Sequence, residues 1–272
     1  MKRTTYILIG LLASGIIVIM AVCFTVLLTS ERRSDTWNTL LGAEQIEKEL
    51  SGVHTLRMIV NQEKKSKRVY LDGMVRILPC SDSQKEKITY PESPYLNVVQ
   101  RNDTLFIELD LDAYKRNEEI AKDQTPYLRL VPPIRLNVNQ LVAINTEMEG
   151  VELVVENMKA DSLDISSRNQ KVVLDSCQLR SLNAAGHGLR LHAKDSKIGN
   201  YYLNLDGVWE WTFENTQIDT EYLTGKGSHS NDLKRGECRR MIWTPASEKA
   251  HLTVTVYDKA DMLLDTVPRT GK

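Results

Sequence analysis

The chain has 272 residues, with 35 lysines and arginines against 36 aspartates and glutamates, and a formal net charge of -1. A hydrophobic share of 42% excludes a wholly disordered chain. The near-neutral charge argues against a nucleic-acid-binding protein, which would carry a basic excess. The mean hydropathy of -0.32 averages two unlike parts, because residues 4–30 contain no charged residue.

The first predicted element is an apolar helix over residues 6–29, which read YILIGLLASGIIVIMAVCFTVLLT. At 1.5 Å per residue it would reach about 36 Å, enough for a hydrocarbon core of about 30 Å. A cleaved signal peptide is the alternative, but the apolar run is longer than such a peptide needs. We therefore predict a transmembrane anchor in residues 1–30, running from Tyr6 to Thr29. The positive-inside rule then places the remainder outside the cytoplasm, in the periplasm or at the cell surface.

Residues 31–50 are predicted to be a juxtamembrane connector, either a short helix or a solvated stalk. From residue 51 onward the pattern indicates strands, because short segments are rich in β-branched and aromatic residues and partly alternate. These segments are 52–60, 68–78, 95–100, 104–111, 127–131 and 134–138.

A repeat of about 19–20 residues follows. Two columns align through it: Ala160, Leu179, Ile198 and Ile218, and Val155, Leu174, Ala193 and Phe213. A single repeat could not bury its own apolar face, so several must stack. The repeat predicts an all-β domain over residues 51–227 that forms a right-handed parallel β-helix, a solenoid. A β-sandwich with regularly spaced strands is the open alternative.

The C-terminal end of such a solenoid needs a cover. Residues 241–243 and 251–258 read as two strands that could close the last rung. We therefore predict cap strands and a tail over residues 228–272.

Three segments are similar to one known family. LSGVHTLRMIV (50–60) is similar to the opening strand of the auto-transporter adhesin head (GIN) domain family of Bacteroidetes-type envelope proteins. YLNVVQRNDTLFIELDL (95–111) resembles its strand–turn–strand element, and 160–188 resembles its rung pattern. The resemblance would cover residues 50 to about 227. It implies a β-helical domain, secreted or membrane-held, without a known catalytic mechanism.

The cysteines and histidines form no motif for a metal, a cofactor or redox chemistry. Cys23 lies in the apolar segment, and Cys80, Cys177 and Cys238 are far apart with no C-x-x-C spacing. A Cys80–Cys238 bridge stays an open alternative. His187 and His192 are separated by an odd number, so on a strand they would face opposite sides. No metal site or cofactor is expected.

Stacked repeats could bring carboxylates together, as glycosidases and polysaccharide lyases require. The candidates are Asp161, Asp164, Asp175 and Asp195. The chain lacks the long loops that wall a cleft, so no catalytic residue is assigned and a polysaccharide-acting enzyme is kept as the alternative function.

The most distinctive surface candidates are aromatic. Trp209, Trp211 and Phe213 alternate and so share one face of a strand. Facing outward, they would form a platform for a sugar ring or a protein; facing inward, they would fill the last rungs, which the alignment of Phe213 favours. Tyr201 and Tyr202 cannot both face inward. The candidate binding surface is Tyr201, Tyr202, Trp209 and Trp211.

Together these features predict a membrane-anchored, extracytoplasmic and non-enzymatic protein. Its function would be binding, adhesion or scaffolding in the cell envelope. Its expected partner is an envelope protein or a carbohydrate, and no nucleic acid.

Overall fold

The structure is a computed structural model of the chain. It describes residues 14–16, 18–22, 38–39, 44–62, 70–81, 84–117, 127–233, 238–256 and 263–266. The chain divides into two units, residues 1–37 and residues 38–272.

In the first unit the described residues form helical pieces at 14–16 and 18–22. No helix among the described residues is long and apolar enough to cross a membrane. The predicted single-pass membrane localisation is therefore wrong, and the extracytoplasmic placement loses the argument on which it rested. The other residues of the predicted span Tyr6 to Thr29, including Cys23, lie outside the described residues.

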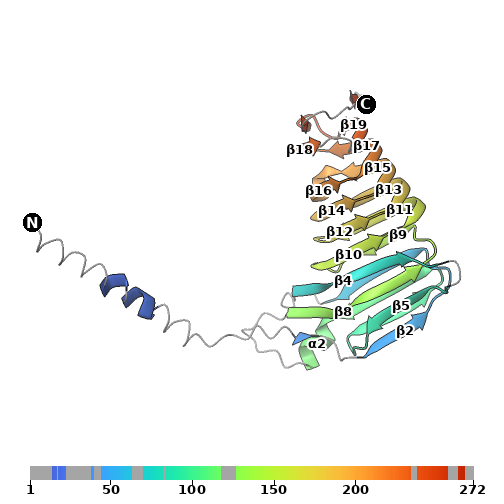
Figure 1. Ribbon diagram of the computed structural model, residues 1–272, viewed down its shortest axis with the longest axis vertical. Coiled ribbons are helices and arrows are strands. Elements are labelled where there is room, and N and C mark those ends of the chain that lie inside the picture. Colours follow the sequence, from blue (N-terminus) through green and yellow to red (C-terminus); the bar gives the residue numbers. More distant parts are fainter. Residues whose placement is uncertain are drawn as a thin grey trace, which may run out of the picture. The chain divides into compact units, whose positions relative to one another are not determined.

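The second unit is built from strands in three sheets (Figure 1). In the described residues the first sheet has the order β16 (Val208–Glu214), β14 (Leu189–Lys194), β12 (Lys171–Asp175), β10 (Val151–Glu156), β4 (Tyr70–Pro79), β8 (Tyr127–Val138), β5 (Lys87–Pro91) and β2 (Gln45–Glu49), with β1 (Asn38–Thr39) beside β8. The second sheet has the order β21 (Leu263–Thr266), β19 (Cys238–Pro245), β17 (Gln217–Gly225), β15 (Lys197–Asn204), β13 (Gln178–His187), β11 (Lys159–Arg168), β9 (Ala143–Thr146), β3 (Thr55–Asn61), β7 (Thr104–Asp110) and β6 (Leu96–Arg101). The third pairs β18 (Ser228–Leu233) with β20 (His251–Val256), and the helices are α2 (Leu111–Asn117) and the 3-10 turn η1 (Leu205–Gly207).

The two large sheets enclose one hydrophobic core. Alternate residues of a strand point inward, as in β7, where Leu105, Ile107 and Leu109 are all fully buried. The Tyr201 ring of β15 meets the Phe213 ring of β16 edge-on, with 5.5 Å between ring centroids, so the inner faces of the two sheets are in contact. The prediction of an all-β protein is confirmed, and its large mixed sheets are compatible with the sandwich-like alternative.

From β10 to β17 the chain alternates between the two large sheets, and each strand from β10 to β15 pairs in parallel with the strand two further along. The column that begins at Val155 and the column that begins at Ala160 are both aligned by this register, residue for residue. The repeat alignment made from the sequence is confirmed. We call residues 151–225 the repeat region.

The polar residues of the repeat form its corners. Asn157, Ser176, Asp195 and Asn215 have φ angles of 55°, 56°, 48° and 48°, in the left-handed region that asparagine and aspartate tolerate better than most residues. Inside the corners the next residues form hydrogen bonds from one repeat to the next: the Cys177 amide donates to Ser196 Oγ at 2.9 Å. These bonds satisfy backbone groups that the turn removes from the sheet.

The N-terminal strands do not follow chain order. In the second sheet β3 lies between β7 and β9, and in the first sheet β4 lies between β8 and β10. Residues Gln45–Glu49, within the predicted connector, form β2, which pairs antiparallel with β5. This segment is therefore a strand and not the expected helix or stalk.

Candidate functional site

The structure separates the four aromatic residues of the predicted binding surface. Tyr201 is completely buried in the core, and burial together with the Glu221 carboxylate raises the pKa of its hydroxyl well above the usual value. Tyr202, its neighbour, is 39% exposed and stacks on Tyr222 with 4.5 Å between ring centroids. One of the two tyrosines thus faces outward, as their alternation requires.

The two tryptophans lie on the first sheet and not beside Tyr202. The pairing of β14 with β16 shifts by one residue, since Leu189 pairs with Val208 but Arg190 pairs with Glu210. Trp209 falls in this shift and is 65% exposed, with the Arg190 guanidinium 5.9 Å from its ring centroid. Trp211 is instead half-buried against the core. A bulge of one residue breaks the alternation on which the prediction depended.

The described cysteines form no disulfide bond. Cys80, Cys177 and Cys238 are all free, so the Cys80–Cys238 bridge is not formed. Burial raises the pKa of the Cys177 thiol to about 11 and that of Cys238 to about 12, so both stay protonated near neutral pH. No group of His, Cys, Asp and Glu suited to a metal ion occurs in the described part of the chain.

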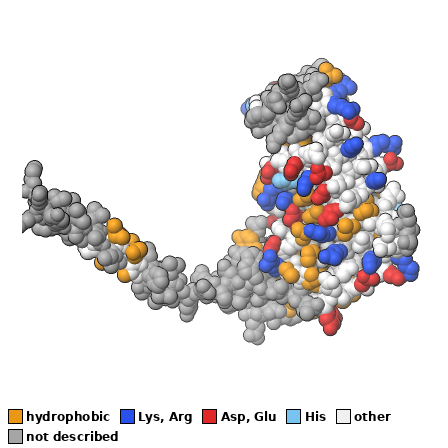
Figure 2. All heavy atoms as spheres, in the orientation of Figure 1, with side chains coloured by type: hydrophobic (Ala, Val, Ile, Leu, Met, Phe, Trp, Pro, Cys, Tyr) orange, Lys and Arg blue, Asp and Glu red, His pale blue; other side chains and the backbone are white. Residues whose placement is uncertain are grey.

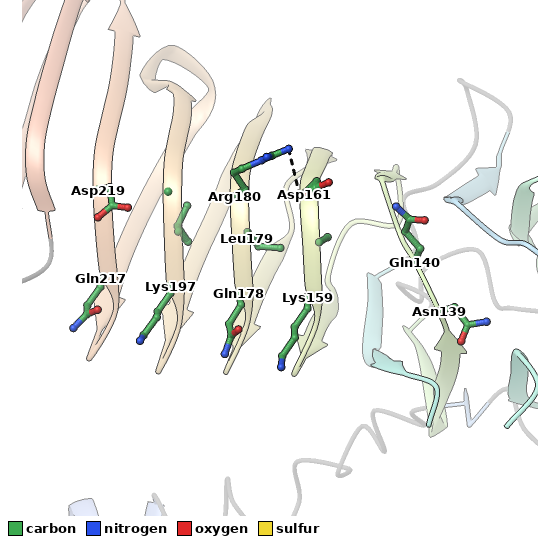
Figure 3. Close-up of a pocket in the computed structure, with 13 residues that line it drawn as sticks. Asn139, Gln140, Lys159, Asp161, Gln178, Leu179, Arg180, Lys197, Gln217 and Asp219 are labelled. Atoms are coloured by element: carbon green, nitrogen blue, oxygen red, sulfur yellow. Dashed lines mark ion pairs between the residues drawn. The ribbon is translucent and has the colours of Figure 1, made fainter. Parts of the chain in front are cut away.

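An open groove of about 850 Å³ crosses β11, β13, β15 and β17 on the outer side of the second sheet (Figure 3). We call it the cross-strand groove. One wall is a row of exposed, in-register side chains that point the same way: Lys159, Gln178, Lys197 and Gln217. The floor is the backbone of Ala160, Leu179 and Ile198, whose side chains pack in or against the core, and the other wall is Asp161, Arg180, Gly199 and Asp219. Asn139 and Gln140 close one end.

The second wall consists of the residues that directly follow the floor residues. In each strand this residue is left out of the register of paired residues, which resumes one position later. Its charges are paired: Arg180 Nη2 lies 3.4 Å from Asp161 Oδ1, and Arg239 Nη1 lies 3.1 Å from Asp219 Oδ1. Gly199 is required here, since a Cβ atom would lie 2.6 Å from the carbonyl oxygen of Arg180. The groove is thus a polar channel between two rows of hydrogen-bonding side chains.

The sequence contains a pattern that predicts this groove but matches no known binding motif. In the repeat alignment, the residue before each member of the Ala160 column is lysine or glutamine, alternating from repeat to repeat. A polar column adjacent to a core column predicts a row of like side chains along the outside of the sheet.

The four aspartates considered for catalysis are dispersed. Asp161 pairs with Arg180, Asp164 lies in register with Asn183, and the Asp195 carboxylate accepts a hydrogen bond from Asn215 at 2.5 Å. Asp175, on the first sheet, lies in register with Glu156 and Lys194. The structure therefore does not bring them together at one site.

No protein-family model matches the chain, and no curated protein matches it. Several solved structures are similar. A "putative adhesin" from Bacteroides fragilis is 15% identical, with a TM-score of 0.43, over 83% of this chain and 98% of the other. A "putative adhesin" from Parabacteroides merdae is 14% identical, with a TM-score of 0.39, over 83% and 96% of the two chains.

A third similar structure is a "putative lipid binding protein" from Parabacteroides distasonis, which is 11% identical, with a TM-score of 0.36, over 84% of this chain and 98% of the other. Identities and TM-scores this low are too small to transfer a function. The likeness is to proteins named as adhesins or as a lipid-binding protein, and no family model identifies a GIN domain.

Proposed function

We propose that the protein is a non-enzymatic binding scaffold, and that its cross-strand groove holds an elongated polysaccharide. In this proposal the repeat region is a parallel β-helix, right-handed by the general preference for such connections. The observation that carries the proposal is the repetition of the groove: like side chains occupy the same register position on four neighbouring parallel strands.

A repetitive site suits a repetitive ligand. Neighbouring strands are about 4.8 Å apart, so the first wall offers a long polar side chain at that interval. A sugar polymer presents the same hydroxyl groups at each ring and can repeat one weak contact along the groove. Amide, ammonium, guanidinium and carboxylate groups, which line both walls, are hydrogen-bonding partners of hydroxyls.

The carboxyl groups of the groove do not support the alternative of a polysaccharide-cleaving enzyme. Asp161 and Asp219 lie on β11 and β17, three strand spacings or about 14 Å apart. Glycosidases hold their two carboxyls within about 9.5 Å. Each of these aspartates is also engaged by an arginine, Arg180 or Arg239.

Affinity electrophoresis of the full chain in gels containing single soluble polysaccharides tests the proposal. Gln178→Trp, at an exposed position in the middle of the first wall, should block the groove and abolish retardation by the polymer that the wild type binds. Lys194→Trp, at an exposed position of the first sheet, is the matched control and should bind normally.

Incubation with the bound polymer should release no new reducing ends and no unsaturated products. Equal retardation of Gln178→Trp and the wild type would contradict the groove as the binding site. Polymer cleavage by the wild type would overturn the non-enzymatic role.

A further inference from the structure

We propose that the cross-strand groove selects acidic polysaccharides that carry a carboxylate on every second sugar ring. This inference rests on the proposed function and specifies its ligand. It follows from the order of charged and neutral side chains along the first wall.

The first wall alternates lysine and glutamine. Lys159 and Lys197 lie two strands apart, about 9.6 Å, with Gln178 on the strand between them and Gln217 on the next (Figure 3). Neither lysine has an ion pair within the described residues, and both are exposed. The wall therefore offers two available ammonium groups separated by one neutral amide.

The carboxylates of the opposite wall do not neutralise Lys159 and Lys197. Asp161 is engaged by Arg180 and Asp219 by Arg239, both across neighbouring strands. Counted with their partners, these two carboxylates contribute no net charge. The net charge available to a ligand is thus positive and comes from Lys159 and Lys197.

The spacing favours a sugar chain over a peptide. In an extended chain of pyranose rings, each ring advances by close to one strand spacing, so every second ring meets a lysine. An extended peptide advances about 3.3 Å per residue, and its alternate side chains recur at about 6.6 Å, out of register with strands about 4.8 Å apart. Glutamine between the lysines suits a neutral ring, because its amide can donate to and accept from hydroxyl or acetamido groups.

Isothermal titration calorimetry of the full chain with three eight-ring oligosaccharides tests the inference. The first alternates glucuronic acid with N-acetylglucosamine, the second carries a uronic acid at every ring, and the third is a neutral cello-oligosaccharide. The alternating probe should bind most tightly at low salt, and its affinity should fall as salt is added. A poly-glutamate peptide that bound more tightly than the alternating sugar would overturn the choice of ligand class.

The single variants Lys159→Gln and Lys197→Gln should each weaken binding of the alternating probe by about three- to fivefold, because each removes one solvent-exposed ion pair with the ligand. The double variant should weaken binding by about tenfold. Lys171→Gln, at a lysine of the first sheet, removes the same charge elsewhere and should leave the affinity unchanged.

A charge-neutral rearrangement tests the spacing itself. The double variant Gln178→Lys with Lys197→Gln keeps the net charge but places the two ammonium groups on adjacent strands. It should lose its preference for the alternating probe and gain affinity for the probe with a carboxylate at every ring. If it behaves as the wild type, while Gln178→Trp still blocks binding, the charge-spacing inference is wrong and the proposed function stands. If Gln178→Trp has no effect, the proposed function itself fails.

Discussion

Glu86 ties together segments that are far apart in the chain. Glu86 is 5% exposed. Its two carboxylate oxygens accept hydrogen bonds from the backbone amides of Val53, at 3.0 Å, and Asn139, at 2.9 Å. Its own carbonyl accepts from the Leu50 amide at 2.8 Å. One acidic residue thus satisfies the backbone at the entry to β3 and at the exit of β8.

Glu86→Ala should lower the free energy of unfolding by about 2–4 kcal/mol, because it leaves the buried Val53 amide and the partly buried Asn139 amide without an acceptor. Glu86→Gln retains one acceptor oxygen and should cost about half as much. Urea unfolding followed by circular dichroism measures both. Glu92→Ala, at an exposed acidic residue nearby, is the control and should change stability by less than about 0.5 kcal/mol. Equal effects at Glu86 and Glu92 would show that the paired hydrogen bonds do not stabilise this region.

Single residues also mark what the sequence could not reveal. The alternation of Trp209 with Trp211 predicts a common face, but the register shift turns Trp209 outward. A bulge is a property of the paired strands, and one strand alone does not encode it. Likewise, nothing in the local pattern around Glu86 predicts a buried carboxylate, since both of its amide partners are more than 30 positions away.

At the scale of elements, Asp206 in η1 connects the repeat region to β18. Its Oδ1 accepts a hydrogen bond from the Lys226 amide at 2.8 Å and lies 3.2 Å from His229 Nε2. The hydrogen bond from the Lys226 amide, with a smaller contribution from His229, lowers the pKa of this carboxyl below its ordinary value of 3.8. Because the carboxylate is favoured in the folded state, its stabilisation is present above about pH 4 and is lost as the pH falls through the lowered pKa.

Asp206→Asn should therefore speed amide exchange in β18 at pH 7 and cost about 0.5–1 kcal/mol, a small value because the side chain is partly exposed. The stability difference from the wild type should shrink below about pH 4, where the wild-type carboxyl also becomes protonated. Hydrogen exchange at pH 7 and thermal unfolding across pH 3–7 check this. Asp164→Asn, at an exposed strand position, is the control. A stability difference that stays constant over that pH range would contradict the role of the charged carboxylate.

Strands were predictable both inside and outside the repeat, as the predicted segments 104–111, 127–131 and 134–138 show, but the order of the strands in a sheet was predictable only within the repeat. The columns that begin at Val155 and Ala160 pair in the structure as the alignment placed them, because each core position recurs after a constant number of residues. The insertion of β3 and β4 between strands that follow them in the chain has no such signal. Strand order there is decided by packing between distant segments, which periodicity does not report.

Across the whole second unit, two large sheets share one core, and their outer faces carry charged side chains beside exposed apolar ones such as Tyr70 and Trp209. Figure 2 shows acidic and basic side chains interspersed over the described part of the visible face. Mixed charge of this kind does not favour a polyanion such as nucleic acid over the surface as a whole. The unneutralised lysines of the cross-strand groove, Lys159 and Lys197, are a local exception that the net charge of -1 conceals.

The cross-strand groove can be recognised only in the folded molecule. Its residues come from β11, β13, β15 and β17, and no two residues of its first wall are closer than 19 positions in the chain. The sequence alignment contained the column, but only parallel pairing turns a column into a continuous wall.

The central claim is that one ligand spans four strands, and the dependence of affinity on ligand length tests it most directly. Titrations of the full chain would use oligosaccharides of alternating glucuronic acid and N-acetylglucosamine with two, four, six and eight rings. The outer strands of the groove are about 14 Å apart, so affinity should rise by about tenfold from two rings to four and then level off. A two-ring probe that binds as tightly as the eight-ring probe would contradict the claim, because two rings reach no more than two neighbouring strands.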